Sequence, residues 1–283
     1  MAAPRSVALG LWAALAVAVF AHGDLHEQID GVTAQIKTSP ENAGLYFKRA
    51  ELHRLHEDWS AAAADYDRAS RLAPDLSAVR LGRGRMLFAS GRLDEAKAEL
   101  DAFLAANPKH ADAFVTRARI EAKRAEHLTA AADFAQAIAL SPRPEPDFFI
   151  ERAQALVAAD DAHLDAALSC LDEGMAKLGN LPSLGLYAIE LDAKAQRFDS
   201  ALARLERLSA ISPRKEAWLE RRGDLLAQAG RTDEAQQAYR AASDAIAKLP
   251  ARLRGTKAIT DLDQRLKAKT AGKTPVANPV PKL

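Results

Sequence analysis

The chain has 283 residues, of which 48% are hydrophobic, 27% charged and only 6% aromatic. This composition is typical of a soluble helical protein and excludes a β-rich or a disordered chain. The formal net charge is +1, so the chain lacks the basic excess of proteins that neutralise phosphates, and we expect no nucleic-acid partner.

Residues 1–21 are predicted to be a secretory signal peptide. Arg5 precedes an uncharged run over residues 6–21, which is shorter than the roughly 20 residues of a membrane-spanning helix. Val19 and Ala21 supply the small residues that precede a cleavage after Ala21, and Ala21 and Gly23 allow a second cut after Gly23. We therefore expect an exported protein, periplasmic or secreted, without a membrane span once the signal is removed. An uncleaved N-terminal anchor is the alternative.

Two pairs of histidines follow the predicted cleavage site. His22 and His26 are four residues apart, and His53 and His56 are three apart, so each pair can lie on one helix face. After cleavage at Ala21, the new amine and the imidazole of His22 would suit copper. An exported metal-binding protein is therefore the alternative function, although we predict no cofactor.

The chain repeats with a period of 34 residues over 22–250. Pro40, Pro74, Pro108 and Pro142 recur at this spacing, and each follows an apolar helical pattern. A half-repeat helix is expected over 25–38. Six blocks follow, of which the fourth needs a two-residue insertion; they begin at about residues 43, 77, 111, 146, 182 and 216.

Side-chain size recurs at fixed positions of each block, counted from its first residue. Position 20 is alanine in all six blocks, position 24 is large and apolar, and position 8 is small except for Ile189. These patterns predict a helical hairpin whose two helices approach closely at the small residues. Proline at position 32 is expected to end the second helix.

Two further positions are polar. Position 18 carries Ser60, Asp94, Asp165, Asp199 and Asp233, which we expect to be N-caps of the second helix, with Trp59 and its equivalents as hydrophobic staples. Position 7 is arginine in five blocks, namely Arg49, Arg83, Arg117, Arg152 and Arg222. We expect these side chains to pack along the helices and pair with nearby acids; a ladder for phosphate is the alternative.

The end of the chain follows a different pattern from the repeats. Residues 251–270 are predicted to form a capping helix, with an apolar stripe formed by Leu253, Ile259, Leu262 and Leu266. Residues 271–283 contain three prolines and are expected to be disordered. The single cysteine, Cys170, excludes an intramolecular disulfide and is expected to be buried.

The small, alanine, aromatic and proline positions together resemble the tetratricopeptide repeat. The resemblance implies an all-α fold, a right-handed α-solenoid of stacked hairpins, whose first helices line a surface that binds peptides or protein segments. No phosphate loop, nucleophile elbow or metal motif indicates an enzyme. We expect a non-catalytic interaction scaffold, with Arg85 and Arg119 binding an acidic segment or a C-terminal carboxylate. The binding positions are Lys48, Glu51, Arg85, Arg119, Lys123, Gln154, Tyr187, Glu190, Arg221 and Asp224.

Overall fold

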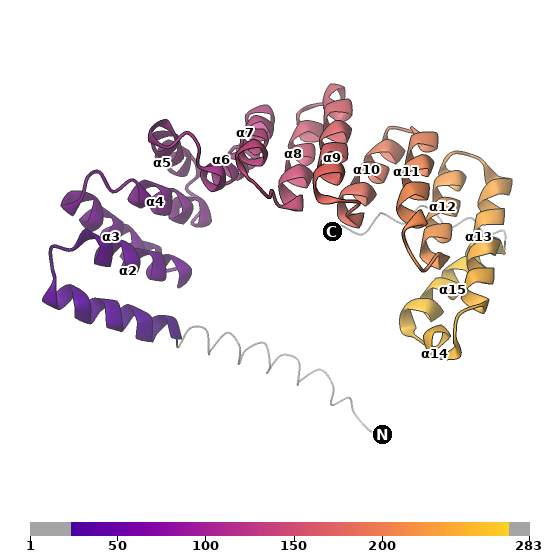
Figure 1. The fold of residues 1–283 in the computed structure, drawn as a ribbon, viewed down its shortest axis with the longest axis horizontal. Helices are drawn as coiled ribbons and strands as arrows, with labels where there is room; N and C mark the ends of the chain where they lie inside the picture. The colour runs from indigo at the N-terminus through magenta and orange to yellow at the C-terminus, as the bar shows by residue number, and fades with distance from the viewer. Residues whose placement is uncertain (1–23, 272–283) are drawn as a thin grey trace, which may run out of the picture. The chain divides into compact units, whose positions relative to one another are not determined.

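A computed structural model describes residues 24–271, and this part of the chain is built of α-helices with one short 3-10 helix. The helices follow one another as hairpins (Figure 1). The expected all-α solenoid of stacked hairpins is confirmed. The predicted signal peptide, His22 and all but one residue of the predicted tail lie outside the described residues.

The chain divides into two compact units, of which unit 1 ends at Pro144 and unit 2 begins at Glu145. Unit 1 contains a helix over residues 24–38, α2 Ala43–Leu55, α3 Trp59–Leu72, α4 Ala78–Ala89, α5 Leu93–Ala106, α6 Ala111–Lys123 and α7 His127–Leu140. Unit 2 contains α8 Pro146–Ala159, η1 Asp161–His163, α9 Leu164–Leu178, α10 Pro182–Lys194, α11 Phe198–Ala210, α12 Glu216–Gln228, α13 Thr232–Ala247, α14 Ala251–Arg254 and α15 Lys257–Thr270.

The residues of fixed size form the core of each hairpin. The alanines at position 20 and the large residues at position 24 are all buried. At position 8, a Cβ added to Gly84 would overlap the side chain of Leu100, and one added to Gly223 would overlap Tyr239. In these two hairpins glycine is therefore required by the large residue of the same hairpin, because the interior leaves no room for another methyl group.

The second helices end where the sequence predicts. Pro74, Pro108 and Pro142 each stand two residues after the last residue of α3, α5 and α7. Proline has no N–H to continue the hydrogen-bond ladder, and it disfavours a helical residue before it. In the fourth block Gly179 takes this role with φ 88°, a left-handed conformation that glycine adopts without strain.

The predicted N-caps are wrong. Ser60, Asp94 and their equivalents lie inside the first turn, because each second helix begins one residue earlier. In α3, α5, α9 and α11 that first residue is the apolar residue expected to be a staple. Asp58 is the N-cap of α3, and its Oδ1 accepts from the N–H of Ala61 at 3.1 Å. An acid in the first turn is also favoured by the helix dipole, so the residue type alone does not separate the two positions.

The turn inside each hairpin passes through the left-handed region at position 15. The residue there is glycine in two blocks, but a residue with a side chain in three others. The fourth block, with its insertion, instead has an extended Asp160 followed by η1. The left-handed residues are Glu57 (φ 61°), Gly91 (φ 81°), Ala125 (φ 60°), Gln196 (φ 59°) and Gly230 (φ 74°).

The C-terminal cap is two helices rather than one. Helix α14 ends before Gly255, and Thr256 is extended before α15 begins, so the predicted helix over 251–270 is broken there. Ile259, Leu262 and Leu266 are buried against α13, while Leu253 on α14 is only half-buried. Within residues 24–271, no helix combines the length and the apolar character needed to cross a bilayer.

Candidate functional site

The expected binding residues lie on the first helix of each hairpin, here called the A helix; the second is the B helix. The A helices are α2, α4 and α6 in unit 1 and α8, α10 and α12 in unit 2. The surface formed by positions 2, 5, 6, 9, 12 and 13 of these helices is called the A-helix face. Because the two units are separate bodies, the A-helix face of each is described by itself.

The A-helix face of unit 1 is basic. Lys48, Arg119 and Lys123 are exposed, and Arg85 is half-buried near the middle of α4. The ammonium of Lys123 lies 4.7 Å from the centroid of the Phe88 ring, a cation–π contact between α6 and α4. These positive side chains come from all three A helices, so the positive charge extends across the unit.

Arg85 differs from most other half-buried arginines. Within residues 24–271 it forms no hydrogen bond or ion pair, and Arg221 on α12 is the other half-buried arginine without one. A guanidinium partly withdrawn from water gains from a neighbouring carboxylate, and both exceptions are expected binding positions. The half-buried arginines that do pair with a carboxylate are Arg49, Arg54, Arg68, Arg83, Arg117, Arg124, Arg152, Arg204 and Arg231.

Glu51, also an expected binding residue, is already engaged within unit 1. Its Oε1 accepts a hydrogen bond from the hydroxyl of Tyr66, and its Oε2 accepts one from Arg54 Nη2 at 2.9 Å. Burial, and secondarily the contact with Glu51, raises the pKa of Tyr66, so the phenol stays protonated and donating. Glu51 therefore supports the hairpin instead of offering a free charge.

The A-helix face of unit 2 is more acidic, and several of its charges are paired. Gln154 is exposed, while Glu190 is half-buried and accepts from Lys194 at 2.8 Å. Tyr187 is half-buried, and burial raises the pKa of its hydroxyl to about 12. Asp224 repeats the arrangement of Glu51, because its Oδ1 accepts from the hydroxyl of Tyr239 at 2.8 Å.

The capping helix α15 binds the last A helix through two cations. Arg265 donates to both oxygens of Glu220 at 2.9 Å, and Lys269 lies 3.0 Å from Glu220 and 2.6 Å from Asp224. Burial opposes ionisation of Glu220, but the hydrogen bonds from Arg265 and Lys269 outweigh it and lower its pKa. The acids at the end of the array are therefore occupied by the chain itself.

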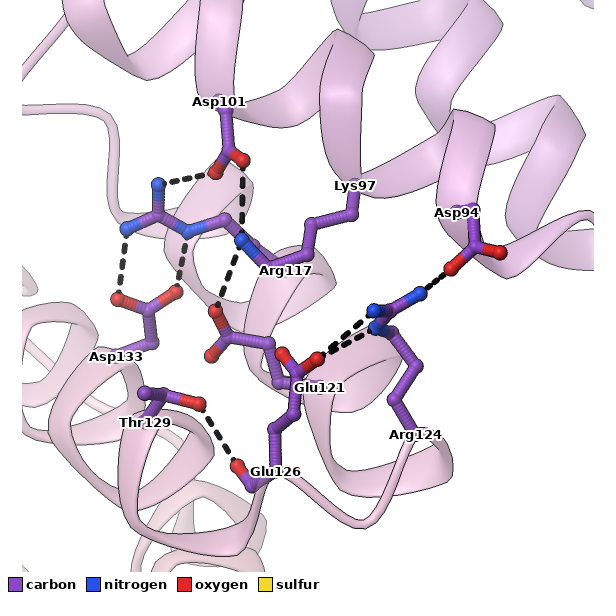
Figure 2. A network of polar contacts seen from close by, with 9 residues as sticks. All are labelled: Asp94, Lys97, Asp101, Arg117, Glu121, Arg124, Glu126, Thr129 and Asp133. Carbon is purple, nitrogen blue, oxygen red and sulfur yellow. Dashed lines mark hydrogen bonds and ion pairs between the residues drawn. The ribbon is translucent and has the colours of Figure 1, made fainter.

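Four of the five arginines at position 7 pair with acids, as predicted, whereas Arg222 is exposed and forms no ion pair within residues 24–271. The phosphate-ladder alternative is not supported. The guanidinium of Arg49 donates two hydrogen bonds to the carboxylate of Asp65, of 2.7 and 2.8 Å. Arg117 reaches two hairpins, because it donates to Asp133 on its own B helix and to Asp101 on the preceding one (Figure 2). Arg83 likewise bonds Asp67 and Glu99, while Arg152 lies 3.7 Å from Glu173.

The histidines pair differently from the sequence expectation. The ring centroids of His26 and His56 are 4.5 Å apart and the ring planes are inclined at 60°, whereas His53 is half-buried with its Nε2 3.9 Å from Asp65. Burial lowers the pKa of His53, which favours its neutral form. Across residues 24–271, no three or more His, Cys, Asp or Glu side chains are grouped to hold a metal ion.

Cys170 is buried, as expected, and its Sγ lies 3.6 Å from the carbonyl oxygen of Phe149. Burial raises the pKa of this thiol to about 11. The thiolate needed for reaction is therefore scarce at neutral pH, and the residue acts as a small apolar side chain.

Repeated hairpins whose A helices present charged side chains define a helical-repeat scaffold for interaction with other proteins. Residues 53–120 and 189–250 each match a model of the tetratricopeptide repeat. The chain is a tetratricopeptide repeat protein. This class generally serves as a scaffold without catalytic activity.

Two curated relatives share part of the repeat region. DnaJ homolog subfamily C member 3 is 31% identical in Rattus norvegicus and 30% identical in Mus musculus, in each case over 155 residues. The aligned stretch covers 55% of this chain but only 26% of either relative. The likeness therefore concerns about a quarter of those proteins.

Two solved structures have the same fold. The C-terminal part of a tetratricopeptide repeat protein from Cytophaga hutchinsonii has a TM-score of 0.64 at 17% identity, with 88% of this chain and 98% of that chain covered. A tetratricopeptide repeat protein from Parabacteroides merdae has a TM-score of 0.52 at 15% identity, with 87% and 93% covered. At these identities the likeness shows the fold alone.

Proposed function

We propose that the chain is a non-catalytic scaffold whose unit 1 A-helix face binds an acidic segment or a free C-terminal carboxylate of another protein. The observation that carries this proposal is Arg85, which is half-buried and has no counter-charge within residues 24–271. A planar guanidinium offers two parallel donors to one carboxylate, which gives both energy and orientation.

The surroundings of Arg85 support the same ligand chemistry. Lys48, Arg119 and Lys123 add exposed positive charge on both sides of α4, which attracts an acidic chain before contact. The carboxylate of Glu51, which lies beside Gly82 on α4, is already held by Tyr66 and Arg54 and forms no ion pair with Arg85. An acidic ligand thus finds an unpaired donor within a basic field.

A peptide array of graded acidic content tests this proposal. We expect the full chain to bind peptides rich in Asp and Glu, with binding weakened by salt. The double variant Arg85→Glu, Arg119→Glu should reduce this binding at least tenfold without changing the circular dichroism melt.

The matched control is Arg71→Glu, an exposed arginine on the B helix α3, which should bind as the original chain does. Undiminished binding by the double variant would refute the proposed site. Selection of neutral or basic peptides would refute the proposed ligand. Affinity capture followed by mass spectrometry then identifies the natural partner among acidic candidates.

We further propose that the protein is exported, on the basis of the charge and apolar pattern of residues 1–21. The mass of the mature chain tests this, because a signal peptidase should leave His22 or Asp24 as the first residue. An intact Met1 in the native protein would contradict export by cleavage.

A further inference from the structure

Glu121 is a buried carboxylate in the middle of a polar network that joins α5, α6 and α7 (Figure 2). Its side chain is 5% exposed, and its Oε2 has no hydrogen-bond partner within residues 24–271. Its Oε1 lies 3.7 Å from the ammonium of Lys97, which is a long ion pair. Glu121 occupies position 11 of its block, where the preceding block has the buried Leu87. A group that prefers water thus stands in a packing position.

The cations around Glu121 are already committed to other carboxylates. Lys97 on α5 bonds Asp101 at 3.0 Å. Arg117 on α6 is held by Asp101 at 2.8 Å and by Asp133 on α7 at 2.6 Å. Within residues 24–271, Lys97 is thus the one cation that forms an ion pair with Glu121, and it is shared with Asp101.

Arg83, Arg85 and Arg124 form no ion pair with Glu121. Arg124 is held by Asp94 and by Glu126. Helix α4, which also packs against α6, carries Arg83, whose guanidinium is held by Asp67 and Glu99, and the unpaired Arg85. Burial first, and then the negative charge of Asp133, raise the pKa of Glu121 to about 7.

We propose that Glu121 is a reversible proton-binding site through which unit 1 responds to pH across the neutral range. With the proton bound, Glu121 is neutral and Lys97 forms its ion pair with Asp101. When the proton leaves to solvent, the buried charge draws Lys97 away from Asp101, and one ammonium is divided between two carboxylates. The contact between α5 and α6, which belong to consecutive hairpins, changes with this exchange.

The direction of the effect on stability follows from linkage. An unfolded glutamate titrates near its ordinary value of 4.5, whereas Glu121 in the folded chain titrates near 7. Between these two pKa values the folded state binds a proton that the unfolded state does not. The protonated carboxyl of Glu121 therefore adds its full contribution to the free energy of unfolding below about pH 4.5, and this contribution falls as pH rises to about 7. Above that range the loss is complete and the contribution is constant.

Carbon-13 NMR of the full chain with labelled glutamate carboxyls tests the proposal directly. The Glu121 signal is assigned by its disappearance in Glu121→Gln and should titrate with a midpoint near pH 7. Glu95, whose pKa is lowered by its hydrogen bonds from Arg92, is the internal control at the acidic end. A Glu121 midpoint below about pH 5.5 would overturn the proposal.

Two variants test the mechanism independently. Lys97→Met removes the cation that opposes the rise in the pKa of Glu121, so it should move the Glu121 midpoint upward; an unchanged or lower midpoint would refute the role of Lys97.

Glu121→Gln should flatten the fall of melting temperature between pH 5 and pH 7.5. Glu95→Gln, the matched control, should leave that slope unchanged. Parallel curves for the original chain and Glu121→Gln would also overturn the proposal.

Discussion

Unit 1 and unit 2 both join consecutive hairpins with arginine–carboxylate pairs, but they place the arginines on different helices. In unit 1 the arginine stands at position 7 of the block, on the A helix, and in two blocks it reaches acids sixteen residues away on both sides, as Arg117 does with Asp101 and Asp133. In unit 2 the arginine of the fifth block stands on the B helix, where Arg204 holds Asp172 and the buried Asp192.

The difference shows what the repeat requires. Asp133 and Asp192 are 7% and 1% exposed, so each carboxylate needs a cation within reach to offset the cost of removing it from water. The fifth block has Ala188 where unit 1 has arginine, and its B helix supplies the guanidinium instead. The requirement is thus a neutralised buried acid between hairpins, and the position of the cation is free to change.

The largest expected effect comes from removing either central arginine. Arg204→Met would leave Asp192 buried without its cation, and should lower the free energy of unfolding of unit 2 by about 3 kcal/mol. Arg117→Met should cost unit 1 a similar amount through Asp133. Urea unfolding, with Trp218 and Trp59 as fluorescent reporters of the two units, measures both. A loss in only one unit would break the proposed equivalence.

A smaller effect is expected at the turns, where the two units agree. Gly91 and Ala125 occupy the same left-handed turn position in unit 1, and a Cβ on Gly91 would meet open space. Gly91→Ala should therefore cost about 1 kcal/mol through backbone strain alone, while Ala125→Gly should gain up to about 1 kcal/mol. Gln196→Gly makes the same test in unit 2. Equal stability of all three variants and the original chain would show that the turn is not strained.

The smallest effect is expected at an exposed ion pair of unit 2, between Asp199 of α11 and Arg231 just before α13. Asp199 pairs with Arg231 at 2.9 Å, but its side chain is 95% exposed. Water and salt screen such a pair, so Asp199→Asn should leave the unfolding curve unchanged within error, including at low salt. A clear loss would mean that unit 2 depends on its edge pairs as well as on Arg204.

The hairpins were predictable because close packing restricts side-chain size at fixed positions of the repeat, and this restriction is visible in the sequence. Alanine at position 20 and the large residue at position 24 recur in every block, and Gly84 cannot carry a side chain beside Leu100. Helix starts were less predictable, because an acid suits both the N-cap and the first turn. The geometry of the turn decides which of the two positions the acid takes. That turn could not be read from the sequence, because its left-handed residues Glu57, Ala125 and Gln196 are of types that seldom adopt a positive φ.

The candidate site was predictable only as a face of the A helices. Position along the helix places Arg85 there, but it does not reveal that Glu51 is held by Tyr66, fifteen residues further on. Buried acids such as Glu121 and Asp192 were also missed, because charged residues are seldom buried. A signal was present for Asp133, since an acid sixteen residues after a position-7 arginine recurs in all three blocks of unit 1.

That spacing has a consequence for the length of the array. Arg117 reaches sixteen residues back to Asp101, and Asp67 holds the same position in the hairpin before. Removal of residues 77–110, one full period, would leave Asp67 sixteen residues before Arg117, where it could replace Asp101. The loss or duplication of one whole period between Arg83 and Arg117 would therefore leave the guanidinium at the new junction with an acid on each side.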